Sequence, residues 1–145
     1  WADNCESMAP CNLTNPQAGS MPYLVSLNRP YINSNQAVYV SIRALPTLTF
    51  QGFMIQARDE KTGQAVGEFD IENKKIRVIN CFGRPDSTAM HNDDLPKTEL
   101  TARWAPEDDN DATITFYVTV AEKLNPLETF WTCQRTKTLK IIKHK

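Results

Sequence analysis

The chain has 145 residues, of which 41% are apolar and 23% are charged, and its net charge is -1. This composition is typical of a globular domain, and the lack of a Lys/Arg excess argues against nucleic acid as a partner. No stretch approaches the roughly 20 apolar residues that a membrane-spanning helix requires. We therefore expect one domain over residues 1–145 without a membrane span.

The first predicted element is an irregular arm over residues 1–22. It contains Pro10, Pro16 and Pro22 and shows no hydrophobic periodicity. Such a segment packs on a domain only if something ties it down, so we expect a covalent anchor in the arm.

The arm also carries two indications of secretion. The chain starts with Trp1 rather than Met, which we interpret as a mature form whose signal peptide has been removed. The sequence Asn12-Leu13-Thr14 is an acceptor for N-glycosylation, so Asn12 is a candidate glycosylation site. Both features predict an extracellular location.

The four cysteines are a further constraint on the fold. They are Cys5, Cys11, Cys81 and Cys133. No two of them form a Cys-x-x-Cys pair, which argues against a zinc ribbon. An even number in a secreted domain favours two disulfides, and spacing alone leaves all three pairings open.

From residue 23 onward, short strand patterns alternate with turn signals. The clearest is Ile114–Val120, where the Ile, Phe and Val side chains alternate with Thr and Tyr. Residues 82–97 contain Gly83, Pro85 and Pro96 and are expected to be irregular. The predicted strands are Tyr23–Leu27, Val38–Arg43, Leu48–Arg58, Ala65–Ile71, Ile76–Cys81, Leu100–Trp104, Ile114–Val120, Leu127–Thr132 and Thr138–Ile142.

Eight or nine short strands with frequent turns predict an all-β fold, an immunoglobulin-like β-sandwich over residues 23–142. A closed barrel with a ligand cavity is the alternative. Gly52 lies inside a predicted strand, which indicates a bulge or a close approach of another group to the backbone.

Residues suited to catalysis are scarce. The only histidines are His91 and His144, and no nucleophile elbow or catalytic triad is evident. His91 lies near Asp93 and Asp94, but this sequence is more typical of a solvated loop than of a metal site. We therefore expect no enzyme activity, no catalytic residue, no metal and no cofactor.

Positive charge is concentrated near the C-terminus, at Arg135, Lys137, Lys140 and Lys143. A charged strand edge of this kind protects a sheet against aggregation. The functional interpretation is a binding site for an anionic polymer or lipid phosphate. A further arginine, Arg58, is expected to hold its strand end to a loop carboxylate.

Several tracts of the sequence are similar to those of one known family. The most specific is Phe50-x-Gly52-Phe53-x-Ile55-Gln56-Ala57-Arg58. The others are Cys5-x-x-Met8-x-Pro10, Pro22-Tyr23, Val66-Gly67-x-Phe69, Cys81, His91, Trp104-x-x-Pro106 and Phe130-Trp131. Together they resemble the reeler domain, found at the N-termini of reelin and F-spondin and alone in small secreted insect defence proteins.

The resemblance implies an immunoglobulin-like sandwich, secretion and a disulfide between Cys5 and Cys81. By elimination, and because the arm needs a tether, we then expect a second disulfide between Cys11 and Cys133. The family often has His where this chain has Cys11, and it usually lacks a counterpart of Cys133.

The same resemblance implies a function. We expect a secreted, non-enzymatic protein of innate immunity that recognises microbial surface glycoconjugates or lipids, such as lipopolysaccharide. The alternative is an extracellular-matrix or adhesion module that binds a protein or a glycosaminoglycan. In either case the basic residues near the C-terminus are the candidate contact site.

Overall fold

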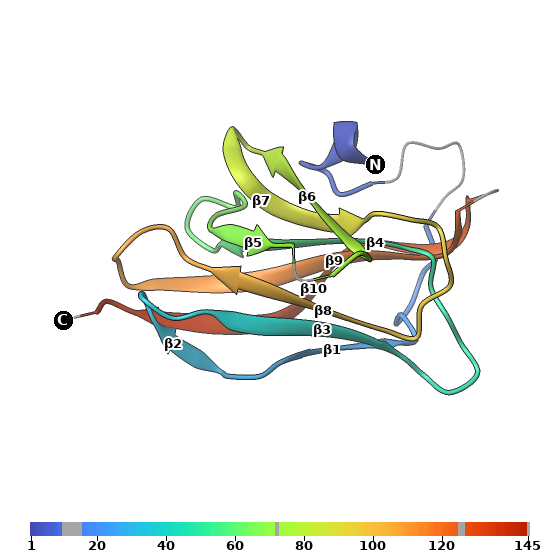
Figure 1. Ribbon diagram of the computed structural model, residues 1–145, viewed down its shortest axis with the longest axis horizontal. Coiled ribbons are helices and arrows are strands. Elements are labelled where there is room, and N and C mark those ends of the chain that lie inside the picture. Colours follow the sequence, from blue (N-terminus) through green and yellow to red (C-terminus); the bar gives the residue numbers. More distant parts are fainter. Residues whose placement is uncertain (10–15, 72, 125–126, 145) are drawn as a thin grey trace.

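The computed structural model describes residues 1–9, 16–71, 73–124 and 127–144. Within these residues the chain forms ten strands in two packed sheets (Figure 1). The strands are β1 (Tyr23–Leu27), β2 (Tyr31–Asn33), β3 (Val38–Ala44), β4 (Gly52–Asp59), β5 (Glu68–Asp70), β6 (Ile76–Cys81), β7 (Arg84–His91), β8 (Glu99–Ala105), β9 (Ala112–Leu124) and β10 (Leu127–Ile142). The predicted all-β sandwich is confirmed, and the closed barrel is wrong.

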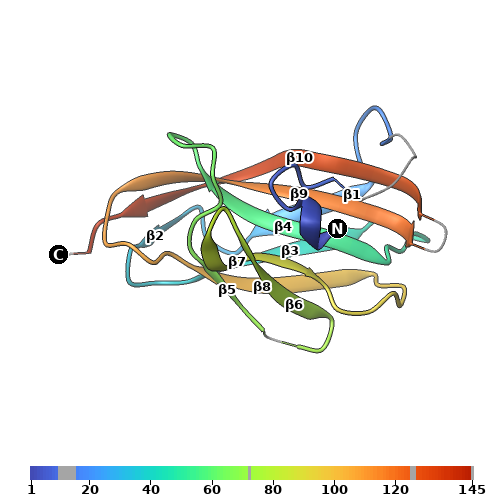
Figure 2. The same ribbon diagram turned by 90° about the horizontal axis from the view of Figure 1, so that it is seen from above.

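The smaller sheet has the order β1-β3-β8-β5, and the larger sheet has the order β2-β10-β9-β4-β7-β6. All pairings are antiparallel except that of β2 with β10. The arm begins with a 3₁₀ turn (Ala2–Asn4), which lies on the outer side of the larger sheet, over β4 and β9 (Figure 2). No described helix has the length and apolar character needed to cross a bilayer.

Strict alternation along the central strands builds the core between the sheets. In β9 the side chains of Ile114, Phe116, Val118 and Val120 are fully buried and face the smaller sheet. Hydrophobic burial of this kind contributes about 1.5–3 kcal/mol for each large apolar side chain. The inward face that the sequence predicts for this strand is therefore confirmed.

Three predictions about the strands are wrong. The irregular segment 82–97 contains β7, an eight-residue strand between β4 and β6. The short parallel strand β2 was not expected. The two strands predicted at the C-terminus are one strand, β10, in which the register with β9 shifts twice. Such shifts absorb extra residues and let one strand continue through an irregular pattern.

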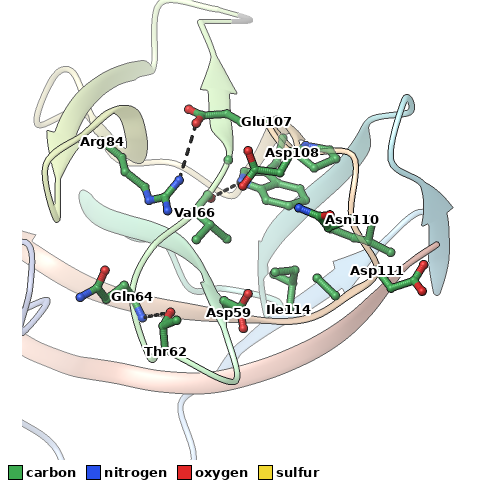
Figure 3. A pocket seen from close by; sticks show the side chains of 15 residues that line it. Asp59, Thr62, Gln64, Val66, Arg84, Glu107, Asp108, Asn110, Asp111 and Ile114 are labelled. Carbon is green, nitrogen blue, oxygen red and sulfur yellow. Dashed lines mark hydrogen bonds and ion pairs between the residues drawn. The ribbon is translucent and has the colours of Figure 1, made fainter. Parts of the chain in front are cut away.

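A close contact between Gly67 and Trp104 fixes one end of the sandwich. Gly67 has a φ of +74°, and a Cβ built on it would lie 2.3 Å from the Trp104 ring. The buried indole donates a hydrogen bond from Nε1 to the carbonyl of Val66 at 3.0 Å (Figure 3). Gly67 is therefore required both by its backbone conformation and by the ring beneath it.

We expect the substitution Gly67→Ala to lower the free energy of unfolding by about 2–4 kcal/mol, because it adds overpacking to an unfavourable backbone conformation. Gly63 provides a matched control, since its φ is +72° but nothing lies within 4 Å of its added Cβ. Gly63→Ala should cost only about 1–2 kcal/mol. Equal losses in chemical denaturation would contradict the role given to Trp104.

Candidate functional site

The outer face of β4 holds the N-terminal arm. Phe53, Ile55 and Ala57 face the core, so Met54 and Gln56 face outward, yet both are fully buried. The arm covers them. Its residues Cys5 and Met8 form an outer cluster with Met54, Cys81 and Met90 of the sheet, and Trp1 packs against this cluster. The arm therefore covers part of the outer face of the larger sheet, including Met54 and Gln56.

Three side chains of the sheet each hold a backbone carbonyl of the arm. Gln56 Nε2 donates to the Cys5 carbonyl at 2.5 Å, and Arg58 Nη2 donates to the Glu6 carbonyl at 2.6 Å. Thr119 Oγ1 donates to the carbonyl of Met8 at 2.6 Å. These contacts satisfy backbone groups of a segment that has no sheet partner of its own.

Arg58 is itself held in place. Its Nε donates to Gln56 Oε1 at 2.9 Å, and its guanidinium lies over the rings of Phe82 and Tyr117, at 5.3 and 5.4 Å from their centroids. The prediction that Arg58 binds a loop carboxylate is wrong, because its partner is a backbone carbonyl of the arm. The most specific tract of the sequence thus serves to dock the arm.

A disulfide between Cys5 and Cys81 completes the attachment and confirms the pairing that the resemblance implies. It closes a loop of 76 residues, which in the chain-entropy model stabilises the fold by about 4 kcal/mol. The candidate residues Cys11 and Asn12 lie outside the described residues. Within the described part of the chain Cys133 forms no disulfide, so the Cys11–Cys133 bridge stays a prediction that non-reducing peptide mapping can decide.

The substitution Gln56→Glu tests the docking of the arm. At neutral pH the introduced carboxylate would face the Cys5 carbonyl without a donor, so we expect a loss of about 1–3 kcal/mol in the free energy of unfolding. Burial raises the pKa of such a carboxyl above its ordinary value of about 4.3. The loss should therefore shrink as the pH falls through the raised pKa, because the protonated acid donates again.

Gln36→Glu is the control, because the Gln36 side chain lies at the surface and acts as an acceptor from the Asn33 amide. Its stability should stay close to that of the parent at both pH values. If Gln56→Glu costs as little as this control at neutral pH, the arm is not held as described.

A second feature of the arm is the contact between Trp1 and the sheet. The Trp1 ring meets the His91 ring edge to face with 4.9 Å between centroids. A Cβ on Gly52 would lie 3.2 Å from Trp1 and 2.7 Å from Leu124. The close approach predicted at Gly52 is confirmed, and Trp1 is packed on the domain.

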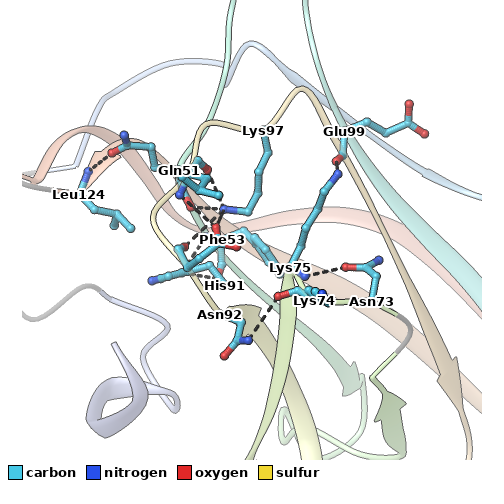
Figure 4. Close-up of polar contacts among 12 residues, drawn as sticks. Gln51, Phe53, Asn73, Lys74, Lys75, His91, Asn92, Lys97, Glu99 and Leu124 are labelled. Carbon is cyan, nitrogen blue, oxygen red and sulfur yellow. Dashed lines mark hydrogen bonds and ion pairs between the residues drawn. The ribbon is translucent and has the colours of Figure 1, made fainter.

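The loop after β7 is organised around His91 and Lys97 (Figure 4). His91 Nδ1 lies 3.2 Å from both the N and O atoms of Phe53, and burial lowers the pKa of the imidazole. The buried Lys97 ammonium donates to the carbonyls of Gln51 and Leu95 and to the carboxylate of Asp93. The Lys97 ammonium thereby joins the loop residues Asp93 and Leu95 to Gln51, which precedes β4.

No group of three or more His, Cys, Asp or Glu side chains within the described ranges is arranged to hold a metal ion. Asp94 is exposed.

The predicted basic residues do not all share one surface. Arg135 and Lys140 lie on the outer face of the larger sheet, opposite Tyr117 and Thr113 of β9. Lys137 lies within a register shift and lines a different hollow, which includes Arg29. Lys143 follows the end of β10, where its backbone amide donates to Asp111.

The structure brings two further cations beside Arg135 and Lys140. Arg58 and Arg135 line a hollow of about 280 Å³, and Lys61 and Lys140 line its neighbour of about 390 Å³. We call the surface formed by Arg58, Lys61, Arg135 and Lys140 the basic face. Arg58 and Lys61 come from the end of β4 and the turn after it, far before β10 in the sequence, so only the pairing of β4 with β9 and of β9 with β10 brings them there.

Three acidic residues, Asp59, Glu60 and Asp111, line the same two hollows and reduce the positive charge of the basic face. Glu60 accepts hydrogen bonds from Thr115 Oγ1 at 2.5 Å and from Arg135 Nη2 at 2.9 Å, and these bonds lower the pKa of its carboxyl. Arg135 is therefore already paired, whereas Lys61 and Lys140 present exposed ammonium groups. The hydroxyls of Thr113, Thr115 and Thr138 lie between these charges on the strand faces.

Comparison with known proteins identifies the family. The family model for the reeler domain matches residues 3–145. The chain belongs to the reeler domain family. Its fold also matches the solved reeler domain of human F-spondin, with a TM-score of 0.67 at 14% identity over 90% of this chain and 94% of that one.

Two relatives show how differently this domain is used. The chain is 25% identical over 144 residues to a Bombyx mori protein named "Putative defense protein", covering 95% of this chain and 81% of that protein. It is 27% identical over 128 residues to a Danio rerio protein named "Putative ferric-chelate reductase 1". That match covers 88% of this chain but only 22% of the longer relative.

Proposed function

We propose that this reeler domain is an extracellular, non-enzymatic binding module of innate immunity. In this proposal it recognises anionic glycoconjugates or lipids of microbial surfaces, such as lipopolysaccharide, through the basic face. The observation that carries the proposal is the set of four cations at the edge of the docked arm and on the part of the outer sheet face beyond it. The similarity to the Bombyx mori defence protein over most of both chains supports the defence role.

The chemistry of the basic face suits a repeating anionic ligand. A single exposed ion pair contributes at most about 1 kcal/mol, so one phosphate would be held weakly. Several such contacts along one polymer or one membrane patch add up, because each contact raises the effective concentration of the next. The hydroxyls of Thr113 and Thr138 can donate to sugar or phosphate oxygens.

The matching test is the double substitution Lys61→Gln/Lys140→Gln. We expect its binding to lipopolysaccharide-bearing bacteria to fall by about five-fold or more at low salt, since two exposed ion pairs are lost. The melting temperature should stay nearly unchanged. Binding of the parent protein should weaken as salt rises, because exposed charges are screened over about 8 Å at physiological ionic strength.

Lys74→Gln/Lys123→Gln is the matched control, because both lysines are exposed and neither belongs to the basic face. A heparin column run alongside separates the defence role from the matrix role. Stronger retention on heparin than on bacteria would favour an adhesion module, and retention on neither would refute an anionic surface ligand. Equal losses in both double variants would place the contact elsewhere.

A further inference from the structure

A further hollow lies at one end of the sandwich, next to the basic face, whose two hollows share Asp59 and Asp111 with it. It is a cleft of about 140 Å³ between the segment that follows β4 and the loop that joins β8 to β9 (Figure 3). Pockets for drug-sized ligands usually measure about 300–1,000 Å³. This cleft is therefore sized for one side chain rather than for a whole metabolite.

The floor of the cleft is apolar. Val66, Pro106 and Ala112 are half-buried in it, and Ile114 lies beneath them. The Trp104 indole behind this floor already uses its Nε1 proton on the Val66 carbonyl. The floor therefore offers hydrocarbon contact and no free donor from this ring.

The rim of the cleft is acidic. Its lining includes the carboxylates Asp59, Glu107, Asp108 and Asp111 but a single cation, Arg84. The one ion pair across the rim, between Arg84 and Glu107, is long at 3.7 Å. A formal charge of -3 is thus gathered on these lining residues, compared with -1 for the whole chain.

Carboxylates next to the rim add to this field. Burial, and next the contact with Glu107, raise the pKa of the Glu68 carboxyl, and Asp86 and Asp70 act in the same direction. A cation placed in the cleft would relieve this repulsion. The apolar floor favours an organic cation, because it can contact a hydrocarbon stem that carries the charge.

The geometry points to a binding site for a lysine side chain of a protein partner. The four-carbon stem of lysine would lie on the apolar floor, and its ammonium would reach the carboxylates of the rim. Lysine combines a compact charge with a flexible apolar stem, whereas the guanidinium of arginine is broader and favours planar, paired acceptors. This site does not rest on the proposed function, because it takes a cation rather than an anion, and Val66, Glu107 and Asp108 line neither hollow of the basic face.

A titration of the isotope-labelled protein with Nα-acetyl-lysine methylamide, followed by NMR, tests the proposal. We expect saturable shifts of the Trp104 indole N–H and of the Val66 and Ala112 amides. The norleucine analogue, which has no ammonium, should shift them far less. Absence of shifts with the lysine compound, or equal shifts with both compounds, would overturn the proposal.

Matched variants identify the groups responsible. Glu107→Gln/Asp108→Asn removes two rim charges and should weaken binding about tenfold. Asp94→Asn/Glu128→Gln removes the same charge from exposed positions outside the cleft and should leave binding unchanged. Equal affinities of all three proteins would refute the assignment, as would equal losses in the two variants.

A short peptide with a central lysine separates a protein partner from a free amine. If the peptide binds more tightly than the capped amino acid, residues flanking the lysine also contact the domain, as a protein partner requires. If the peptide does not bind while n-butylamine does, the cleft takes a small amine, and the protein partner is wrong.

Discussion

The burial of Gln56 on the outer face of the larger sheet is the constraint on which the rest of the structure depends. A buried amide must find hydrogen-bond partners, and here it contacts the Cys5 carbonyl, Thr88 Oγ1 and the guanidinium of Arg58. Of these partners, the Cys5 carbonyl is in place only when the arm is docked. The arm is therefore an integral part of the domain, and it leaves only the rest of the sheet face for a ligand.

How much could be predicted from the sequence is clearest from the strands. Alternation in Ile114–Val120 marks the core-facing side of the strand directly, because every second side chain is apolar. In β7 this signal is missing, because its buried residues include the polar Ser87 and Thr88, which form hydrogen bonds with Cys81 and Gln56. β2 is three residues long and exists only through its pairing with β10, so no local pattern could predict it.

The surfaces were harder to predict than the strands for a related reason. The sequence correctly marked β10 as basic, but its two register shifts place Lys137 apart from Arg135 and Lys140. Their neighbours Arg58 and Lys61 come from a segment far away in the sequence. The acidic cleft similarly needs segments that lie far apart in the sequence. The acidic loop at residues 106–111 therefore does not indicate the cleft by itself.

The way the arm is attached also has a consequence for the order of folding. The groups that hold Cys5, Glu6 and Met8 come from β4, β6 and β9, so no complete receptor for the arm exists until the chain as far as Thr119 has paired. The loop closures that this requires are paid for in chain entropy before any of these contacts forms. Within this domain the segment that is synthesised first is thus the last to be fixed, and until then Cys5 stays open to exchange with other thiols.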